Sequence, residues 1–419
     1  MSLRELPLLF AVFLDLVGFG MAFPDIQLRA EKFGAPGLLI GALLSSYFAV
    51  QLIASPKWGS LSDRIGRKPV LLVCTALSAL SMLVYGFADN VWFILASRVL
   101  AGLAAANVVV GQAYIADITP ERGRVAAMGR VSAAILGGLV AGPAIGGELA
   151  AIGGNRLLGF TSSGFSALSF IWILFGVRAI PPSEKRKPGS RGILDLSLLF
   201  EVPALSRIVV VASAGWFVLA CLEGTFGRLI EHLFGYGQRE FGWIFSYESL
   251  LGAFTGLAVA WLSKRMKPVS ILRAGYVMQS IGLGLTPLAG VIAATALGPL
   301  AAAITSAMGA LHIAGSASGP FLALLLLSSL YAFGAGIANP VVNSVCSSLT
   351  PEFRQGELFG LLQAARSVGF LIGPGLGGWL FDWHAEAPYF LAGGVALLAA
   401  LIIWVPENQL EDSQSKASE

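Results

Sequence analysis

Long apolar runs alternate with short charged segments along the whole chain. A helix needs about 20 apolar residues to cross the hydrocarbon core of a bilayer. The pattern predicts twelve such helices, six on each side of a charged stretch at 181–191. They lie near residues 6–25, 38–56, 69–87, 92–115, 125–150, 159–177, 207–231, 240–262, 269–291, 319–346, 356–380 and 387–406. The sequence therefore predicts an all-α integral membrane protein made of two six-helix halves.

The charged stretch sets the expected domain organisation. We expect an N-terminal six-helix half at 1–178, a cytoplasmic linker at 179–206, a C-terminal half at 207–406 and a cytoplasmic tail at 407–419. Residues 292–318 are rich in Ala, Gly and Ser and have no counterpart in the first half. A thirteenth span would place the C-terminus on the opposite side of the membrane, so we expect this insertion at the outer surface.

Basic residues gather in every second loop. One set of loops holds Lys57, Arg64, Arg67, Lys68, Arg122, Arg124, Lys185, Arg186, Lys187, Arg191, Lys264, Arg265, Lys267 and Arg354. The other set holds only Arg29, Lys32, Arg156, Arg228 and Arg239. Cytoplasmic loops carry the excess of Lys and Arg, so both termini are expected in the cytoplasm, with the protein in the inner or plasma membrane. The central basic cluster would also suit anionic lipid headgroups, although fixing the topology is the simpler explanation.

The composition supports a membrane protein. Of 419 residues, 56% are hydrophobic and only 12% are charged, whereas soluble domains carry roughly 25% charged residues. The net charge of +3 gives no reason to expect a nucleic-acid partner. The three cysteines all lie in apolar runs, and the three histidines lack metal-ligand spacing. We therefore expect neither a disulfide framework nor a metal site, and no cofactor.

Three short elements recur at one spacing. Each copy in the second half lies 231 residues after the first: Thr119-Pro120-Glu121 and Thr350-Pro351-Glu352, Gly129 and Gly360, and Gly142-Pro143-x-x-Gly146-Gly147 and Gly373-Pro374-x-x-Gly377-Gly378. A shared spacing indicates duplication of a six-helix unit. Parallel repeats of this kind place a substrate site at their interface, near the middle of the membrane.

The charged loop Gly59–Lys68 carries a specific motif. It reads Gly-Ser-Leu-Ser-Asp-Arg-Ile-Gly-Arg-Lys and matches the signature Gly-x-Leu-x-Asp-Arg-x-Gly-Arg-Lys at every fixed position. On this loop the chain resembles the major facilitator superfamily. The first half is most similar to the twelve-span drug:proton antiporters, the tetracycline-efflux branch included, in the segments 14–24, 98–102 and 138–147. The resemblance implies the major facilitator fold, with two pseudo-symmetric halves.

Two departures from that branch bear on the substrate. The region after Pro24 reads Asp25-Ile26-Gln27, where the family often has a second proline. The tetracycline pumps use an acid in their ninth helix, but residues 269–291 contain no Asp or Glu. Tetracycline itself is therefore not expected as a substrate.

Ionisable residues inside the predicted spans are the candidate proton-coupling and substrate residues. Each costs about 2.5–3.5 kcal/mol on insertion scales, so each needs a reason. Asp15 in the first helix would carry a proton or balance a substrate charge; alternatively it holds helices together. By resemblance, Arg98 in the fourth helix would help a nearby acid to release its proton. Alternatively, Arg98 reaches to a membrane face or holds backbone carbonyls.

The second half has two acids well inside its membrane runs. Glu223 and Glu248 lie in the seventh and eighth helices, and either could replace the missing ninth-helix acid. We rank Glu223 first because it lies further from the loops. Arg366, in the eleventh helix, is its possible partner.

The charged loop and the fifth helix are candidates for conformational change. By resemblance, the loop forms a latch in which Asp63 caps a helix of the second half and Arg67 bridges to Asp117; Gly59, Arg64 and Gly66 complete it. A solvated basic loop is the alternative. Small residues and a proline give the fifth helix a flat, kinkable face typical of antiporters: Gly138, Gly142, Pro143, Gly146 and Gly147. Ordinary helix packing is the alternative there.

These features favour a secondary transporter rather than an enzyme. No phosphate-loop motif Gly-x-x-x-x-Gly-Lys-Ser/Thr occurs, so a nucleotide is not expected as the energy source. We expect proton-coupled efflux of lipophilic small molecules, with protons and membrane lipids as the other partners. The alternative is a facilitator or symporter for a polar metabolite such as a sugar or carboxylate, with Arg98 and Arg366 binding anions. A membrane receptor or lipid-modifying enzyme on a transporter-like fold has no supporting motif.

Overall fold

The computed structural model describes residues 5–179, 203–295, 319–350 and 355–403, and within these ranges it contains helices and no strands. Most of the predicted linker, the insertion from residue 296 onward, Arg354 and the tail lie outside the described residues. The chain divides into two compact units. The first is Met1–Ser190 with Tyr236–Ser246, and the second is Arg191–Gly235 with Tyr247–Glu419.

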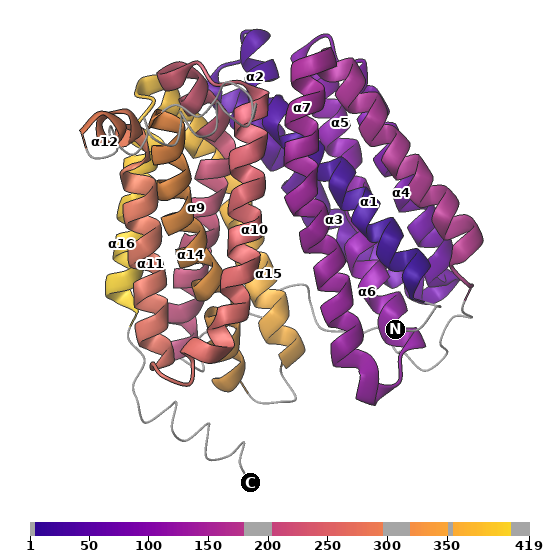
Figure 1. The fold of residues 1–419 in the computed structure, drawn as a ribbon. Coiled ribbons are helices and arrows are strands. Elements are labelled where there is room, and N and C mark those ends of the chain that lie inside the picture. Colours follow the sequence, from indigo (N-terminus) through magenta and orange to yellow (C-terminus); the bar gives the residue numbers. More distant parts are fainter. Residues whose placement is uncertain (1–4, 180–202, 296–318, 351–354, 404–419) are drawn as a thin grey trace, which may run out of the picture. The chain divides into compact units, whose positions relative to one another are not determined.

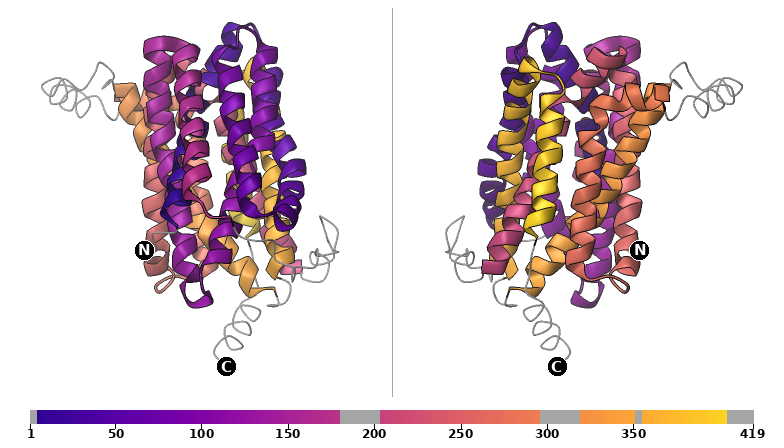
Figure 2. Two further views of the ribbon diagram at one scale, coloured as in Figure 1. Left: turned by 90° about the vertical axis from the view of Figure 1, so that its right-hand side faces the viewer. Right: turned by 90° about the vertical axis from the view of Figure 1, so that its left-hand side faces the viewer.

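The helices of each unit run side by side along a common direction (Figures 1 and 2). The first unit contains α1 (Leu6–Met21), α2 (Phe23–Lys32), α3 (Gly37–Ile65), α4 (Arg67–Gly86), α5 (Val91–Ala104), α6 (Asn107–Ile118) and α7 (Glu121–Gly176). The second contains α9 (Pro203–Phe234), α11 (Pro268–Gly284), the 3-10 helix η1 (Thr286–Leu288), α12 (Ala289–Thr295), α14 (Gly319–Ser348), α15 (Gln355–Trp383) and α16 (Ala387–Ile402). Helix α10 (Gln238–Leu262) contributes its first residues to the first unit and the rest to the second.

By length and composition, the described residues contain seven helices able to cross a membrane, or eight if α11 and α12 are one span bent by 43°. One of these stretches, Ala126–Gly176, contains two predicted spans. Within the described residues, each of the twelve predicted spans lies mostly in helix. The fold is therefore all-α, with helices of membrane-spanning length, and it is consistent with twelve spans.

Several helix ends differ from the prediction. The first span continues to Lys32 but is interrupted at Ala22, next to Pro24 at the start of α2. The fourth span is interrupted at Ala105 and Ala106, where no proline or glycine marks the break. The predicted helices 125–150 and 159–177 are both present as the two parts of α7, which are separated by a kink at Gly154, where φ is +62°. A left-handed residue of this kind favours glycine.

Three glycines of α7 pack directly against the backbone of α1. A Cβ atom added to Gly138 would lie 2.9 Å from the carbonyl oxygen of Phe13, and one added to Gly142 would lie 2.7 Å from that of Val17. At Gly146 it would overlap the backbone of Met21. Only glycine allows this approach, which explains the spacing of four residues between them.

The second unit repeats this packing. Gly369, Gly373 and Gly377 lie 231 residues after the three glycines of α7, and a Cβ at each would contact α9, the first helix of this unit. The prolines correspond as well. Pro143 lies against Gly20 of α1, and Pro374 lies against Gly224 of α9. The repeat seen in the sequence is therefore a repeat of one helix-packing geometry.

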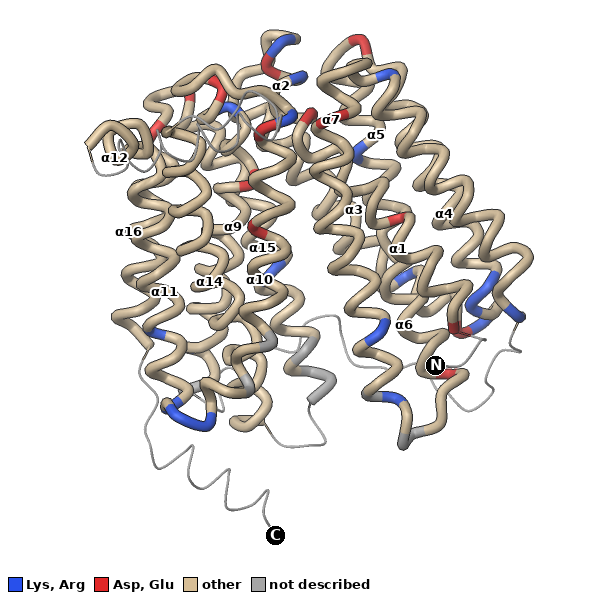
Figure 3. The backbone as a smooth tube through the Cα atoms, in the orientation of Figure 1, with Lys and Arg blue, Asp and Glu red and all other residues tan. Residues whose placement is uncertain are grey.

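Many of the charged residues in each unit lie near the helix ends, and a few lie within the helices (Figure 3). The prediction that Arg29 and Arg228 lie in outer loops is wrong, because they belong to α2 and α9. Arg228 is buried, donates to Asp382 at 3.0 Å and lies 4.2 Å from the centre of the Phe381 ring. An arginine can be buried inside a helix end when a carboxylate and an aromatic face compensate its charge.

We predict that Gly142→Ala destabilises the first unit, because the new methyl group would meet backbone atoms of α1 that cannot rotate away. Overpacking of this kind costs about 1–3 kcal/mol. Thermal unfolding of the purified protein in detergent should show a clear fall in the apparent melting temperature. Gly164→Ala is the matched control, since it lies in the part of α7 beyond the kink and has no atom within 4 Å of its added Cβ. Equal melting temperatures for the two variants would contradict the packing argument.

Candidate functional site

Asp15 lies buried in the middle of α1 and is bound by three neutral side chains. Ser78 of α4 donates to its Oδ1 at 2.7 Å, and Ser166 of α7 donates to the same atom at 3.3 Å. Asn107, the first residue of α6, donates from Nδ2 to Oδ2 at 3.0 Å. Among the described residues no Lys or Arg forms an ion pair with Asp15.

Arg98 of α5 is buried, with only 2% of its surface exposed. Its Nη2 donates to the hydroxyl of Ser97 at 3.0 Å and lies 3.8 Å from the sulfur of Met82. Its Nε has no hydrogen-bond partner within the described structure. The guanidinium also lies 5.5 Å from the centre of the Tyr85 ring. No carboxylate of the described part of the chain pairs with it, so the predicted partner acid is not at its side.

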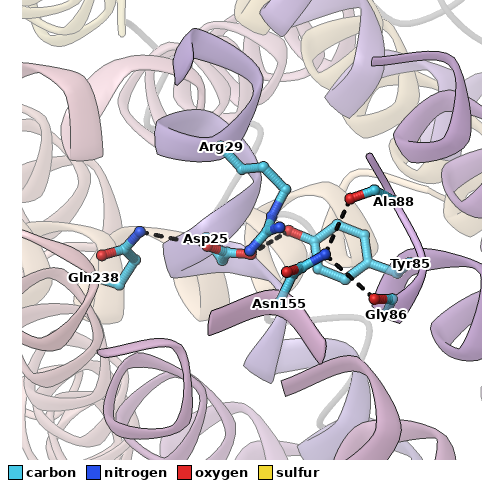
Figure 4. A network of polar contacts seen from close by, with 7 residues as sticks. All are labelled: Asp25, Arg29, Tyr85, Gly86, Ala88, Asn155 and Gln238. Atoms are coloured by element: carbon cyan, nitrogen blue, oxygen red, sulfur yellow. Dashed lines mark hydrogen bonds and ion pairs between the residues drawn. The ribbon is translucent and has the colours of Figure 1, made fainter. Parts of the chain in front are cut away.

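A buried ion pair also lies beside Tyr85 (Figure 4). Asp25 of α2 accepts 2.7 Å hydrogen bonds from Arg29 and from the hydroxyl of Tyr85, and a weaker 3.4 Å bond from Gln238. The guanidinium of Arg29 lies 5.6 Å from the Tyr85 ring centre, so two arginines face one ring. Asp25 and Tyr85 are both almost completely buried. The negative charge of Asp25 therefore balances the positive charge of Arg29. This group has no further negative charge to balance that of Arg98.

The bend in α7 is tied to the same region. Asn155, next to Gly154, donates to the carbonyl oxygens of Gly86 at 3.2 Å and Ala88 at 3.0 Å (Figure 4). These carbonyl groups lie at the end of α4 and just beyond it, where carbonyls have no hydrogen-bond partner within the helix. The bend therefore fixes the end of the helix that carries Tyr85.

The second unit brings two carboxyl groups and one arginine together. Glu223 of α9 lies within electrostatic range of Arg366 of α15 and of Glu248 of α10. The hydroxyl of Ser328 donates to Glu248. The guanidinium of Arg366 lies 4.7 Å from the centre of the Trp216 ring. One arginine cannot balance two ionised carboxylates, so this group carries an excess negative charge when both acids are ionised.

The charged loop Gly59–Lys68 forms the junction between α3 and α4. Gly66 has φ of +97°, a conformation that other residues rarely adopt, and it ends one helix and begins the next. A Cβ on Gly59 would meet no atom within 4 Å, so the described contacts do not explain that glycine. Arg64 is exposed on the last turn of α3.

Arg67 occupies the centre of this junction and is buried. Its guanidinium donates to Ser62 at 2.5 Å, pairs with Asp63 at 2.6 Å and pairs with Asp117 of α6 at 3.0 Å. All three nitrogens of the guanidinium are therefore occupied. The pair with Asp117 joins the start of α4 to the end of α6, which puts Arg67, Asp63 and Asp117 in one group.

The glycines of the fifth predicted span differ in their contacts. Gly138, Gly142 and Gly146 face α1, as described above. Gly147 instead faces the first residues of α10, where an added Cβ would overlap the carbonyl oxygen of Gln238. The hydroxyl of Ser246 accepts from the backbone amide of Ala144 at 2.9 Å, just beyond Pro143. The proline leaves no amide of its own at that turn.

Sequence reasoning missed Tyr85, Asn107, Ser78 and Ser166. A weak signal was present, because polar residues recur on one face of α7: Ser162 donates to the carbonyl of Gly18, and Ser169 donates to that of Ala11. Their spacing of three or four residues is that of one helix face. Serine is common in membrane helices, so this spacing alone does not identify an acid site.

Comparisons with known proteins agree with the fold. The family model of the Major Facilitator Superfamily matches residues 8–317 and 295–419. Multidrug resistance protein 2 of Bacillus subtilis is 26% identical over 411 residues, covering 95% of this chain and 94% of that protein. The quinolone resistance protein NorA of Staphylococcus aureus is 25% identical over 404 residues, covering 96% of both chains.

Solved transporter structures share the fold. The human organic anion transporter MFSD10 (TETRAN) has a TM-score of 0.61 at 21% identity, covering 96% of this chain and 98% of that one. The nucleoside transporter NupG has a TM-score of 0.71 at 13% identity, with the same coverage. Together with the family match over nearly the whole length, these findings show that the chain is a multi-pass membrane protein of the Major Facilitator Superfamily.

Proposed function

We propose that this protein exports lipophilic small molecules across the cell membrane in exchange for protons. The observation that carries the proposal is the position of Glu223, which lies within electrostatic range of both Arg366 and a second acid, Glu248. The names of the similar bacterial proteins, which refer to multidrug and quinolone resistance, support a drug-like substrate. Both termini would lie in the cytoplasm.

The excess acid gives a route to coupling. Burial penalises the charged form of a carboxyl group, so when both acids are ionised the excess negative charge of the group is stabilised by a proton or by a cationic substrate. Because the two compete for one negative charge, binding of one favours release of the other. Transport then needs only that the group be reached from each side of the membrane in turn, as the two halves rock.

Arg67 and its partners would control that rocking. The junction holds α3, α4 and α6 together through Asp63 and Asp117, and by family resemblance it stabilises the outward-facing state. Loss of a few tenths to about 2 kcal/mol at such a site shifts a two-state equilibrium several-fold. The glycine-rich face of α7 would provide the close, smooth helix contact across which such movements occur.

A facilitator or symporter for an anionic metabolite is the second candidate. It is favoured by Arg98, a buried guanidinium with no carboxylate partner in the described structure. A guanidinium binds carboxylates through paired hydrogen bonds. Single-carbon-source growth tests with and without the gene would identify such a substrate.

The proposed function is tested by dye uptake into inverted membrane vesicles. Collapse of the pH gradient with a protonophore should abolish accumulation of a lipophilic dye. If accumulation does not depend on the protein or is insensitive to the gradient, proton-coupled export is wrong.

We predict that Glu223→Gln lowers pH-gradient-driven uptake into inverted vesicles by at least about tenfold, because an amide cannot exchange a proton. Counterflow exchange of preloaded substrate should continue, since it needs binding and rocking but no proton transfer. Glu231→Gln, two turns further along α9, serves as the control and should keep both activities. Full gradient-driven uptake by the Glu223→Gln variant would show that Glu223 does not couple the proton. Glu248 would then be the remaining candidate, or the protein would not be proton-coupled.

We predict that Arg67→Gln reduces transport at least about fivefold while membrane insertion is unchanged. The substitution removes the ion pairs to Asp63 and Asp117, and a several-fold loss corresponds to about 1 kcal/mol. Asp63→Asn should have a smaller effect in the same direction, because Arg67 keeps Asp117. Lys57→Gln, an exposed basic residue on the same helix as Asp63, is the control. Wild-type initial rates for Arg67→Gln at equal expression would exclude the latch.

A further inference from the structure

The surroundings of Asp15 raise a problem of charge. This carboxylate is 92% buried within a span, since its exposed fraction is 8%, and its partners Ser78, Asn107 and Ser166 are all neutral. A buried ion without a counter-charge costs several kcal/mol even when it is hydrogen-bonded. The site therefore needs one compensating positive charge, which the described side chains do not supply.

Oxygen atoms are gathered around Asp15 at a spacing that suits a small cation. Ser166 Oγ lies 3.3 Å from both Asp15 Oδ1 and Ser78 Oγ, and Ser78 Oγ lies 2.7 Å from Asp15 Oδ1. Oxygens that bind a cation at about 2.3–2.6 Å and at right angles to one another lie about 3.3–3.7 Å apart. Two of the three edges of this triangle match that spacing, and the third, at 2.7 Å, would need to lengthen by at least about 0.6 Å on binding.

Asn107 distinguishes a bound cation from a bound proton. Its Nδ2 donates to Asp15, whereas its Oδ1 is buried with no hydrogen-bond partner among the described residues. Protonation of Asp15 would let a flipped amide accept through Oδ1, but Nδ2 would then lose its acceptor. A cation beside the carboxylate would bind Oδ1 and leave the Nδ2 bond in place, so it satisfies both ends of the amide.

The backbone next to Asn107 offers further oxygen atoms. Asn107 directly follows the break between α5 and α6, where the last carbonyls of α5 lack helical partners apart from the bond from Ala105 to Gly102. In secondary transporters, cations are bound where interrupted helices expose such carbonyls near the middle of the membrane. The break therefore lies at the position that a cation site requires.

We propose that Asp15, Ser78, Ser166 and Asn107 form a binding site for Na⁺. A single carboxylate matches one positive charge, whereas a divalent ion would need more acidic ligands. K⁺ is larger and would need the three oxygens further apart. The inference goes beyond the export function proposed above and does not depend on it. It also departs from the expectation that the chain holds no metal ion, which considered only His and Cys.

The test is the thermal stability of the purified full-length protein in detergent, with no substrate present. Melting curves are recorded in rising NaCl, with choline chloride keeping the ionic strength constant, and in matching series of KCl and LiCl. A ligand that binds only the folded state raises the melting temperature in proportion to the logarithm of its concentration above the dissociation constant. We expect the melting temperature to rise above a threshold Na⁺ concentration and to show no such rise with K⁺ over the same range.

Three variants locate the effect. Asn107→Leu and Ser166→Ala each remove one proposed ligand, and each should raise the Na⁺ concentration at which the melting temperature begins to rise by about tenfold or more. Asp15→Asn should abolish the Na⁺ response. Ser163→Ala is the matched control, because Ser163 lies on the same helix as Ser166 but donates to the carbonyl of Ala79 at 2.9 Å. It should keep the wild-type response.

Either of two results would overturn the proposal. One is a wild-type melting temperature that does not respond to Na⁺ relative to choline at equal ionic strength. The other is a Na⁺ response that Asn107→Leu and Ser166→Ala leave unchanged although both variants fold, as judged by their melting in choline. Because the assay measures binding without transport, it can succeed where the vesicle assay for export fails, and the two failures are distinguishable.

Discussion

Compensation of charge in a medium without water is the constraint on which this structure depends. Every ionised group inside a span must find an opposite charge or a cage of donors. Asp25 and Arg29 meet this requirement with each other, and Arg228 meets it with Asp382. Asp15 and Arg98 do not meet it with any ion pair in the described structure. Such groups are where bound ions or substrates change the stability of the protein most.

The same constraint explains why the helices can pack so closely. Because backbone groups are satisfied within each helix, two helices can meet through bare backbone when one of them presents glycine. The contacts of Gly142 on α1 and of Gly373 on α9 are of this kind. Because apolar side chains gain little from leaving lipid for a helix interface, such close backbone contacts help to hold the helices together.

The sequence predicted the features that leave a periodic or composition signal. The length of the apolar runs predicted the helical spans. The loop Gly59–Lys68 predicted the family, because its residues are needed for a turn with positive φ and for an arginine that forms ion pairs. The interruption at Ala105–Ala106 could not be predicted, since alanine favours helix. The contacts of Tyr85 with Arg29 and Arg98 could not be predicted either, because they join α2, α4 and α5 in space and no local spacing encodes them. For the same reason Arg29 was placed in a loop.

The glycine contacts also bear on how the protein can change over evolutionary time. Gly142 and Gly146 touch mainly the backbone atoms of Val17, Gly20 and Met21. Backbone atoms are the same whatever side chain a residue carries. The first helix can therefore exchange many of its side chains without losing its position in the unit. In a framework of repeated units held in this way, the residues that fix the fold differ from those that select the substrate. Substitutions on α1 or α9 can therefore alter what is bound while the packing of the unit stays the same.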